Sequence, residues 1–132
     1  MAILGTGIDI IENNRLKKVI NKNKSAFKKK IFTTNEIAYC EKKLNNISCY
    51  SKRFAAKEAF VKALGTGFRK NINFKDIEIC NNSLGKPYIA INKYIKNKIK
   101  NIFKVKQFNI LLSISDEKKH AIASVIISKK WK

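Results

Sequence analysis

Hydrophobic and polar residues alternate with a period of two in some stretches of the chain and recur every three or four residues in others. The two-residue period is typical of strands. It predicts strands at residues 2–12, 76–80, 88–91, 107–115 and 120–128. Residues 116–119 and 81–87 are rich in turn-forming and charged residues, so each is expected to close an antiparallel hairpin.

The helical spacing, together with capping residues, predicts four helices, at about residues 14–20, 34–44, 51–65 and 92–103. Thr33 and Glu36 have the spacing of a capping box. Ser51 is expected to cap the third helix, and Gly65 is expected to end it in a left-handed conformation. The lysine-rich residues 21–30 are expected to be solvated, and residues 45–47 to form a turn.

The length and composition indicate a single compact domain over residues 1–132, of the α+β class, with an antiparallel sheet packed by helices. A chain of 132 residues with 45% hydrophobic residues can bury a core. No apolar stretch has membrane-spanning length and no signal peptide is evident, so a cytoplasmic protein without a membrane partner is expected. Cys40, Cys49 and Cys80 lack metal-site spacing and are expected to be reduced and buried.

The formal net charge of +20 indicates a polyanionic partner, which is a nucleic acid, an acidic protein or a phosphorylated ligand. An alternative is that A/T-rich codons, which encode Lys, Asn and Ile, placed many lysines on the surface without a function. Arginine offers a planar fork of donors that lysine lacks. Arg15, Arg53 and Arg69 are therefore the basic residues most expected to make specific contacts.

Two segments contain candidate ligands for a metal or a phosphate. In the first strand, Asp9 lies on the same face as Gly5 and Gly7, opposite a face with Leu4, Ile8 and Ile10. Glycines leave space for a metal or ligand near the carboxylate; the alternative is a strand end with a solvated aspartate and a bulge.

The central helix is the second segment. Glu58 and Lys62 are four residues apart and share a face, and small residues beside Glu58 leave room for a ligand. The backbone N–H groups of residues 65–67 could face a phosphate. The alternative is a surface helix with an ordinary exposed ion pair and a glycine stop.

Taken together, the acidic residues Asp9, Glu58 and 116–117 suit Mg²⁺, which proteins hold with one or two carboxylates plus water and substrate phosphate. Lys62 and Arg53 are groups that neutralise phosphate oxygens. The sequence therefore predicts phosphate chemistry, provided that these groups meet in the fold.

Motifs along almost the whole chain match one known family. They are Gly-x-Gly-x-Asp at residues 5–9 followed by Arg15, the stretch 53–67, Gly-Lys-Pro at 85–87, and Ser-Ile-Ser-Asp at 113–116 with the alternating residues 121–126. In these motifs the chain resembles the holo-[acyl-carrier-protein] synthase family of 4′-phosphopantetheinyl transferases. The stretch around Glu58 is the most specific of them.

The resemblance implies transfer of 4′-phosphopantetheine from coenzyme A to a serine of apo acyl carrier protein, in fatty acid biosynthesis, with release of adenosine 3′,5′-bisphosphate. Asp9 and Glu58 match the Mg²⁺ ligands, and Lys62 matches the lysine on the diphosphate. Glu58, Lys62 and Asp116 are the catalytic candidates, with Glu58 preferred over Asp116 as the base. Many members carry histidine at the position of Asp116, and His120 is a further, weaker candidate.

The resemblance also implies binding positions and an oligomer. The residues expected near the coenzyme A nucleotide are Arg53, Lys62, Gly65, Thr66, Gly67, Gly85, Lys86 and Pro87. Arg15 is expected to meet the acidic carrier protein. Similar proteins are homotrimers with sites between neighbouring subunits.

The competing hypothesis is a small basic nucleic-acid-binding module without catalysis. Its basic residues are spread along the chain, no nucleic-acid motif is present, and the hypothesis does not account for Asp9 and Glu58. We therefore predict an enzyme with no nucleic-acid partner.

Overall fold

The computed structural model describes residues 2–23, 25–66 and 71–130. Its strands are β1 (Ile3–Glu12), β2 (Ile77–Asn81), β3 (Pro87–Ile91), β4 (Phe108–Asp116) and β5 (His120–Lys129). Its helices are α1 (Asn13–Asn23), α2 (Ser25–Ile31), α3 (Thr34–Glu41), α4 (Asn46–Leu64) and α5 (Lys93–Phe103), with a short 3₁₀ helix η1 (Phe74–Asp76).

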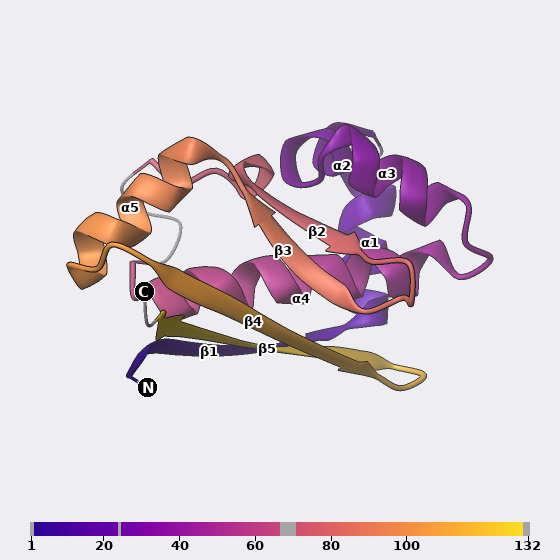
Figure 1. Ribbon diagram of the computed structural model, residues 1–132. Coiled ribbons are helices and arrows are strands. Elements are labelled where there is room, and N and C mark those ends of the chain that lie inside the picture. The colour runs from indigo at the N-terminus through magenta and orange to yellow at the C-terminus, as the bar shows by residue number, and fades with distance from the viewer. Residues whose placement is uncertain (1, 24, 67–70, 131–132) are drawn as a thin grey trace.

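Helix α4 lies between two antiparallel sheets (Figure 1). One sheet has three strands in the order β1-β5-β4, and the other is the hairpin β2-β3. Helices α1, α2 and α3 gather at one end of the molecule, and α5 lies at the opposite end (Figure 1). The predicted α+β class with antiparallel pairing is confirmed, but the strands divide between two sheets instead of forming one.

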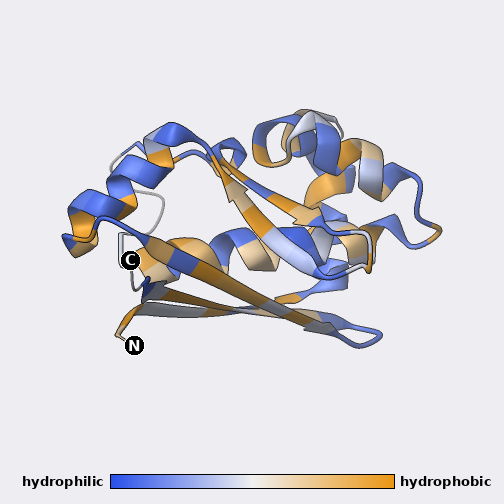
Figure 2. Ribbon diagram, in the orientation of Figure 1, coloured by the Kyte–Doolittle hydropathy of each residue, from blue (hydrophilic) through white to orange (hydrophobic). Residues whose placement is uncertain are grey.

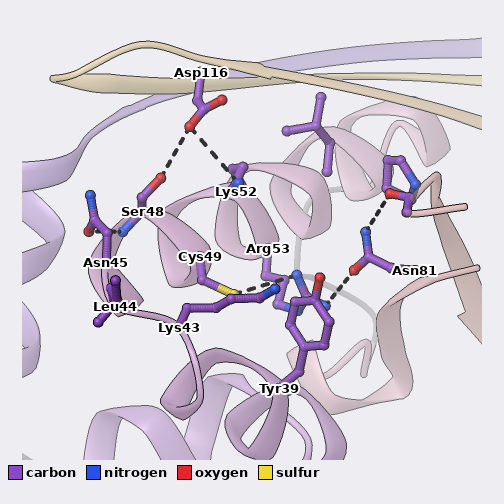
Figure 3. Close-up of a pocket in the computed structure, with 13 residues that line it drawn as sticks. Tyr39, Lys43, Leu44, Asn45, Ser48, Cys49, Lys52, Arg53, Asn81 and Asp116 are labelled. Atoms are coloured by element: carbon purple, nitrogen blue, oxygen red, sulfur yellow. Dashed lines mark hydrogen bonds and ion pairs between the residues drawn. The ribbon is translucent and has the colours of Figure 1, made fainter.

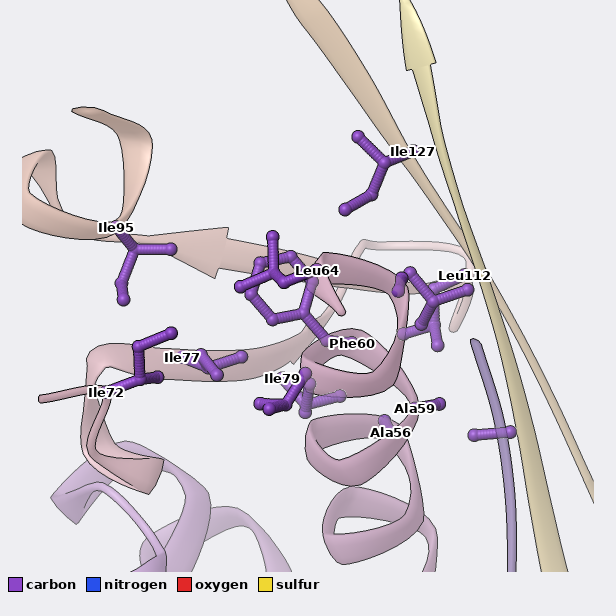
Figure 4. Close-up of a cluster of buried hydrophobic side chains, with 14 of the residues drawn as sticks. Ala56, Ala59, Phe60, Leu64, Ile72, Ile77, Ile79, Ile95, Leu112 and Ile127 are labelled. Carbon is purple, nitrogen blue, oxygen red and sulfur yellow. The ribbon is translucent and has the colours of Figure 1, made fainter. Parts of the chain in front are cut away.

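The main core surrounds the C-terminal half of α4, where Phe60 and Leu64 contact both sheets and α5 (Figure 4). Ile77 and Ile79 of β2, Ile95 of α5 and the inward residues of β5 complete it. Each fully buried side chain of this size contributes about 1.5–3 kcal/mol through removal of apolar surface from water. Figure 2 shows the complementary pattern, with hydrophilic residues along the outer side of α5 and around the β4–β5 turn.

A buried ion pair connects α4 to the small helices. Lys57 Nζ lies 2.7 Å from Glu36 Oε1 and donates to the carbonyls of Ile31 and Phe74 at 2.8 and 2.9 Å. Glu36 also accepts the N–H of Thr33, which confirms the predicted capping box at the start of α3. Burial lowers the pKa of the Lys57 ammonium, and the Glu36 carboxylate opposes this change. Because both charges are satisfied, the pair fixes α4 against its neighbours.

The glycines of β1 face α4, and their role differs from the prediction. A Cβ atom on Gly5 or Gly7 would collide with the backbone carbonyl of Ala63 or Ala59, respectively. The absent side chains therefore admit the helix backbone, not a metal or ligand. Leu4 does not share the exposed face of Ile8 and Ile10 as predicted. It packs against the core, because the pairing register of β1 shifts between Ile3 and Gly5.

Several helix boundaries also differ from the prediction. Helix α4 begins at Asn46, because the Asn45 side chain accepts the N–H of Ser48 and caps it earlier. Residues 45–47 are therefore not a turn. Ser51 does not cap the helix, since it is buried in its interior. Helix α3 ends at Glu41 instead of residue 44, and residues 21–30 include the end of α1 and most of α2. The C-cap at Gly65, with φ of 81°, is confirmed.

The prediction of three reduced cysteines is wrong for two of them. Cys40 and Cys49 form a disulfide between α3 and α4, while Cys80 is a free thiol. The spacing of the cysteines in the sequence gives no information on how α3 packs against α4, and this packing brings together two cysteines nine positions apart. Cys40 and Cys49 are buried, as expected.

Among the helices of the described residues, none combines the length and the hydropathy that crossing a bilayer requires.

Candidate active site

Asp9, Glu58 and Lys62 meet where β1 crosses α4. Lys62 Nζ donates to Asp9 Oδ1 at 3.0 Å and to the carbonyl of Ile8 at 2.9 Å. Burial raises the pKa of the Glu58 carboxyl, the nearby Asp9 carboxylate raises it further, and Lys62 opposes both. The two acids, far apart in the sequence, are therefore close enough to repel one another. The predicted meeting of these groups is observed.

The packing of small residues accounts for this meeting. Gly5 and Gly7 let the backbone of α4 lie directly against β1 at Ala59 and Ala63. Asp9 lies on the same face of β1 as the two glycines, one step further along the strand. Its carboxylate therefore lies beside α4, close to Glu58 and Lys62. Helical spacing places Glu58 and Lys62 one turn apart along the crossing.

Asp9 and Glu58 line a pocket of about 430 Å³, which we call the Asp9 pocket. Its charged residues also include Glu12 and Arg15, and its apolar wall consists of Ile10, Ile11, Leu16, Val19, Phe27 and Phe54. Arg15 was predicted to be a partner-binding residue, and it lies at this pocket. The pocket thus combines three carboxylates, Asp9, Glu12 and Glu58, with the Arg15 cation and an apolar wall.

The chemistry of the Asp9 pocket fits one hard divalent cation. No group of three or more His, Cys, Asp or Glu side chains suited to a metal occurs within residues 2–23, 25–66 and 71–130. Two carboxylates are nevertheless the usual protein share of a Mg²⁺ shell that substrate phosphate and water complete. Burial and then repulsion from Asp9 raise the pKa of Glu58, and a cation between the two carboxylates would relieve the repulsion.

A second pocket, of about 440 Å³, lies around Arg53 and is called the Arg53 pocket here (Figure 3). Arg53 is buried; it donates to Asn81 Oδ1 at 2.9 Å and stacks over Tyr39 at 4.2 Å from the ring centroid. Within the described part of the chain, its Nε atom has no hydrogen-bond partner. Lys43 and Lys52 also line the pocket. A guanidinium flanked by two ammonium groups suits a phosphate.

Asp116 lies in the Arg53 pocket and does not line the Asp9 pocket. Its carboxylate accepts from Ser48 Oγ at 3.2 Å and lies 3.9 Å from Lys52 Nζ (Figure 3). Within one chain, the structure therefore separates Asp116 from Glu58. His120 lies at the β4–β5 turn, where Nδ1 is 2.7 Å from Glu117.

The predicted glycine-rich positions have different outcomes. Gly85 and Pro87 line the Arg53 pocket, whereas the intervening Lys86 is exposed. The N–H of Gly65 donates to the carbonyl of Lys62 and completes the helix cap, so it does not face a phosphate as predicted. Thr66 lines neither the Asp9 pocket nor the Arg53 pocket. Gly67 and Arg69 lie outside the described residues.

Comparison with known proteins supports the motif analysis. The family model described as 4′-phosphopantetheinyl transferase superfamily matches residues 5–124. The chain belongs to this superfamily. It is 54% identical over 130 residues to a holo-[acyl-carrier-protein] synthase of Pelagibacter ubique, covering 98% of this chain and 100% of that protein. The family resemblance predicted from sequence is thereby confirmed.

Solved structures of the superfamily share the fold. A holo-(acyl-carrier-protein) synthase from Bacillus anthracis, in complex with coenzyme A (3′,5′-ADP), is 36% identical with a TM-score of 0.79, covering 98% of this chain and 100% of that chain. The Helicobacter pylori holo-[acyl-carrier-protein] synthase, in complex with coenzyme A, is 32% identical with a TM-score of 0.76, covering 93% and 99%. These comparisons give no support to the nucleic-acid-binding alternative.

Sequence analysis missed several residues of this transferase-family chain that line the pockets. Tyr39, Ser48 and Asn81 form part of the Arg53 pocket, and Phe27 and Phe54 form part of the Asp9 pocket. Phe54 belongs to the signature stretch and could have been chosen on that basis. The other four carry no local signal: Phe27, Tyr39 and Asn81 reach the pockets only because α2, α3 and β2 pack around α4, and Ser48 lies in a part of α4 that was predicted to be a turn.

Proposed function

We propose that residues 1–132 form one catalytic domain that transfers 4′-phosphopantetheine from coenzyme A to a serine of an apo acyl carrier protein, releasing adenosine 3′,5′-bisphosphate. The reaction requires Mg²⁺ and serves fatty acid biosynthesis in the cytoplasm. The observation that carries this proposal is that Asp9 and Glu58 line one pocket and that Lys62 donates to Asp9. Membership of the transferase superfamily and the coenzyme A complexes of similar proteins support it.

Asp9, Glu58 and Lys62 each have a proposed task. Asp9 and Glu58 would hold Mg²⁺, which when bound neutralises charge on the coenzyme A diphosphate. Lys62, already 3.0 Å from Asp9, reorients its ammonium toward the diphosphate and stabilises the charge that develops on the leaving phosphate. Glu58 accepts the proton of the attacking serine hydroxyl. Asp116 is less suited to this role, because Lys52 and Ser48 hold it in the other pocket.

The Arg53 pocket takes the nucleotide end of coenzyme A in this proposal. Arg53, Lys43 and Lys52 offer positive charge to its phosphate groups, and Gly85 and Pro87 line the wall where the adenosine is expected. Arg53 is held in the wall of this pocket by Asn81 and Tyr39. Arg15 and the net positive charge of the chain attract the acidic carrier protein to the Asp9 pocket.

A homotrimer is part of the proposal. The face of the β1-β5-β4 sheet that points away from α4 exposes Ile8 by 58%, Ile10 by 63% and Leu111 by 51%. An apolar surface of this kind is typical of an interface between subunits.

Light scattering is expected to give the mass of three chains. Ile10→Lys is expected to lower that mass, whereas Leu84→Lys, at an exposed leucine in a turn, should leave it unchanged.

Intact-mass spectrometry of the carrier tests the activity. Incubation of apo acyl carrier protein with this chain, coenzyme A and Mg²⁺ is expected to add one phosphopantetheine group to the carrier. Glu58→Gln is expected to lower the rate by at least about a hundredfold, since one charged catalytic group is lost while the fold stays intact. A carrier of unchanged mass with the folded wild-type chain would refute the proposal.

A further inference from the structure

The Cys40–Cys49 disulfide forms part of the wall of the Arg53 pocket. Helix α3 supplies Tyr39 to the pocket immediately before Cys40, and α4 supplies Cys49 four residues before Arg53. Cys49 itself lines the pocket (Figure 3), while Cys40, to which it is bonded, is completely buried. The bond therefore joins the two helices at the level of the pocket.

Two of the contacts that orient Arg53 depend on this connection. Arg53 Nη1 donates to Cys49 Sγ at 3.8 Å, and the guanidinium stacks on Tyr39, the residue next to Cys40. Its third contact, with Asn81 on β2, is independent of the disulfide. Cleavage of the bond would release the α3 side of the stacking pair and change the sulfur that accepts the Arg53 donor.

We propose that Cys40–Cys49 is a reversible modification site, and that its reduction weakens the binding of phosphate-bearing nucleotides in the Arg53 pocket. The inference rests on the proposed function, which places the nucleotide end of coenzyme A there. A disulfide in a cytoplasmic protein is more often redox-sensing or catalytic than structural. Its position beside the most buried cation of the pocket gives the modification a direct effect on ligand binding.

The chemistry requires a cellular thiol such as glutathione as the reductant. A first thiolate enters the pocket and attacks Cys49 Sγ; the Cys40–Cys49 bond breaks, and Cys40 leaves as a thiolate that takes up a proton. A second thiolate attacks the reductant sulfur of the mixed disulfide, which releases Cys49 and a small-molecule disulfide. The Arg53 guanidinium, 3.8 Å away, stabilises negative charge on the departing Cys49 sulfur.

A bound nucleotide should affect both the rate of reduction and the redox equilibrium of the bond. Since Cys40 is buried and Cys49 is reached from the pocket, a nucleotide in the pocket should hinder reduction of the bond. If reduction lowers nucleotide affinity, thermodynamic linkage requires the nucleotide to stabilise the oxidised form by the same factor.

The test measures binding of adenosine 3′,5′-bisphosphate by calorimetry to the oxidised and the reduced full-length chain. Thiol titration under denaturing conditions should give one thiol before reduction and three after it. Reduction is expected to weaken nucleotide binding by about fivefold or more, within the usual range of coupling between sites. Saturating nucleotide should slow reduction of the wild-type disulfide. Circular dichroism confirms that the reduced chain stays folded.

Two variants complete the design. Cys40→Ala/Cys49→Ala should bind the nucleotide as weakly as the reduced wild type and should not respond to reductant. Cys80→Ser removes the thiol that does not line the pocket, and it should behave as wild type in both redox states. Equal affinity in the two redox states, or three thiols in the chain after treatment with an oxidant, would overturn the inference and leave the proposed function intact. Absence of nucleotide binding in both states would overturn both.

Discussion

Glu58 lies beside Asp9 in a partly buried position, and its pKa is raised for that reason. An acid with a raised folded-state pKa favours the folded state fully only at pH values below its ordinary pKa. That contribution is lost as the pH rises through the raised value. The same arrangement that suits a cation therefore destabilises the metal-free protein at neutral pH.

Glu58→Gln should consequently stabilise the metal-free fold. At pH 8, in the presence of a chelator, its melting temperature is expected to exceed that of the wild type by a few degrees, because a neutral amide replaces a repelled carboxylate. Near pH 4 the difference should vanish, since Glu58 is then protonated in the wild type. Thermal unfolding followed by circular dichroism measures both values.

Glu117→Gln is the matched control for this measurement. Its carboxylate is exposed, and the hydrogen bond from His120 lowers its pKa, so its removal gives no gain in melting temperature. Equal melting temperatures of Glu58→Gln and the wild type at pH 8 would show that Asp9 and Glu58 do not repel one another.

At this scale, the sequence indicated the acids and Lys62 because their types and spacing are distinctive. It did not indicate Tyr39 or Asn81, whose side chains are common and whose role depends on contact with Arg53. The sequence also did not show that the Gly65 N–H is used in the helix cap, because the same glycine pattern is typical of a helix cap and of a phosphate-binding loop.

At the scale of the elements, the packing of β1 against α4 determines where the acids lie. The contact is between two glycines and the helix backbone at Ala59 and Ala63, so it has no side chains that could move aside. Any added atom at Gly5 or Gly7 must displace the helix or the strand.

Gly7→Ala should therefore destabilise the protein by about 1–3 kcal/mol or more, as overpacking of a close contact does. The displacement would also separate Asp9 from Glu58, so Mg²⁺-dependent transfer is expected to fall more than the folded fraction does. Urea unfolding and the carrier-mass assay measure the two effects. Thr6→Ala, at the exposed neighbouring position, should change neither; a wild-type stability for Gly7→Ala would contradict the close packing.

The periodicity predicted the type and order of most elements, because apolar residues recur every second position in β5 and every three or four positions in α5. It failed at the start of α4, where Asn45 competes with Ser51 as the cap. It also failed for the cysteine pair, since a disulfide depends on how α3 returns along α4 and not on local spacing.

At the scale of the whole molecule, the net charge of +20 creates a long-range field around the pockets. The division of the strands into two sheets on either side of α4 was not predictable, because strand periodicity does not specify which hairpins pair. The field itself follows directly from composition.

Encounter with an acidic carrier protein should therefore depend on salt. Raising the ionic strength from about 0.02 to 0.2 M is expected to lower kcat/KM for the carrier by roughly tenfold or more, while kcat changes little. Arg15→Gln, at the Asp9 pocket, should raise KM for the carrier more than Lys96→Gln on α5 does. Equal effects of the two substitutions would indicate that the lysine-rich surface acts only through its total charge.

Calorimetric titration of Mg²⁺ in the presence of coenzyme A is the most direct measurement of the central claim. The wild-type chain is expected to bind one Mg²⁺ per coenzyme A. Asp9→Asn and Glu58→Gln should each weaken that binding by at least about tenfold, because each removes one of two carboxylate ligands. Binding of Mg²⁺ with wild-type affinity by both variants would contradict a cation shared by Asp9 and Glu58.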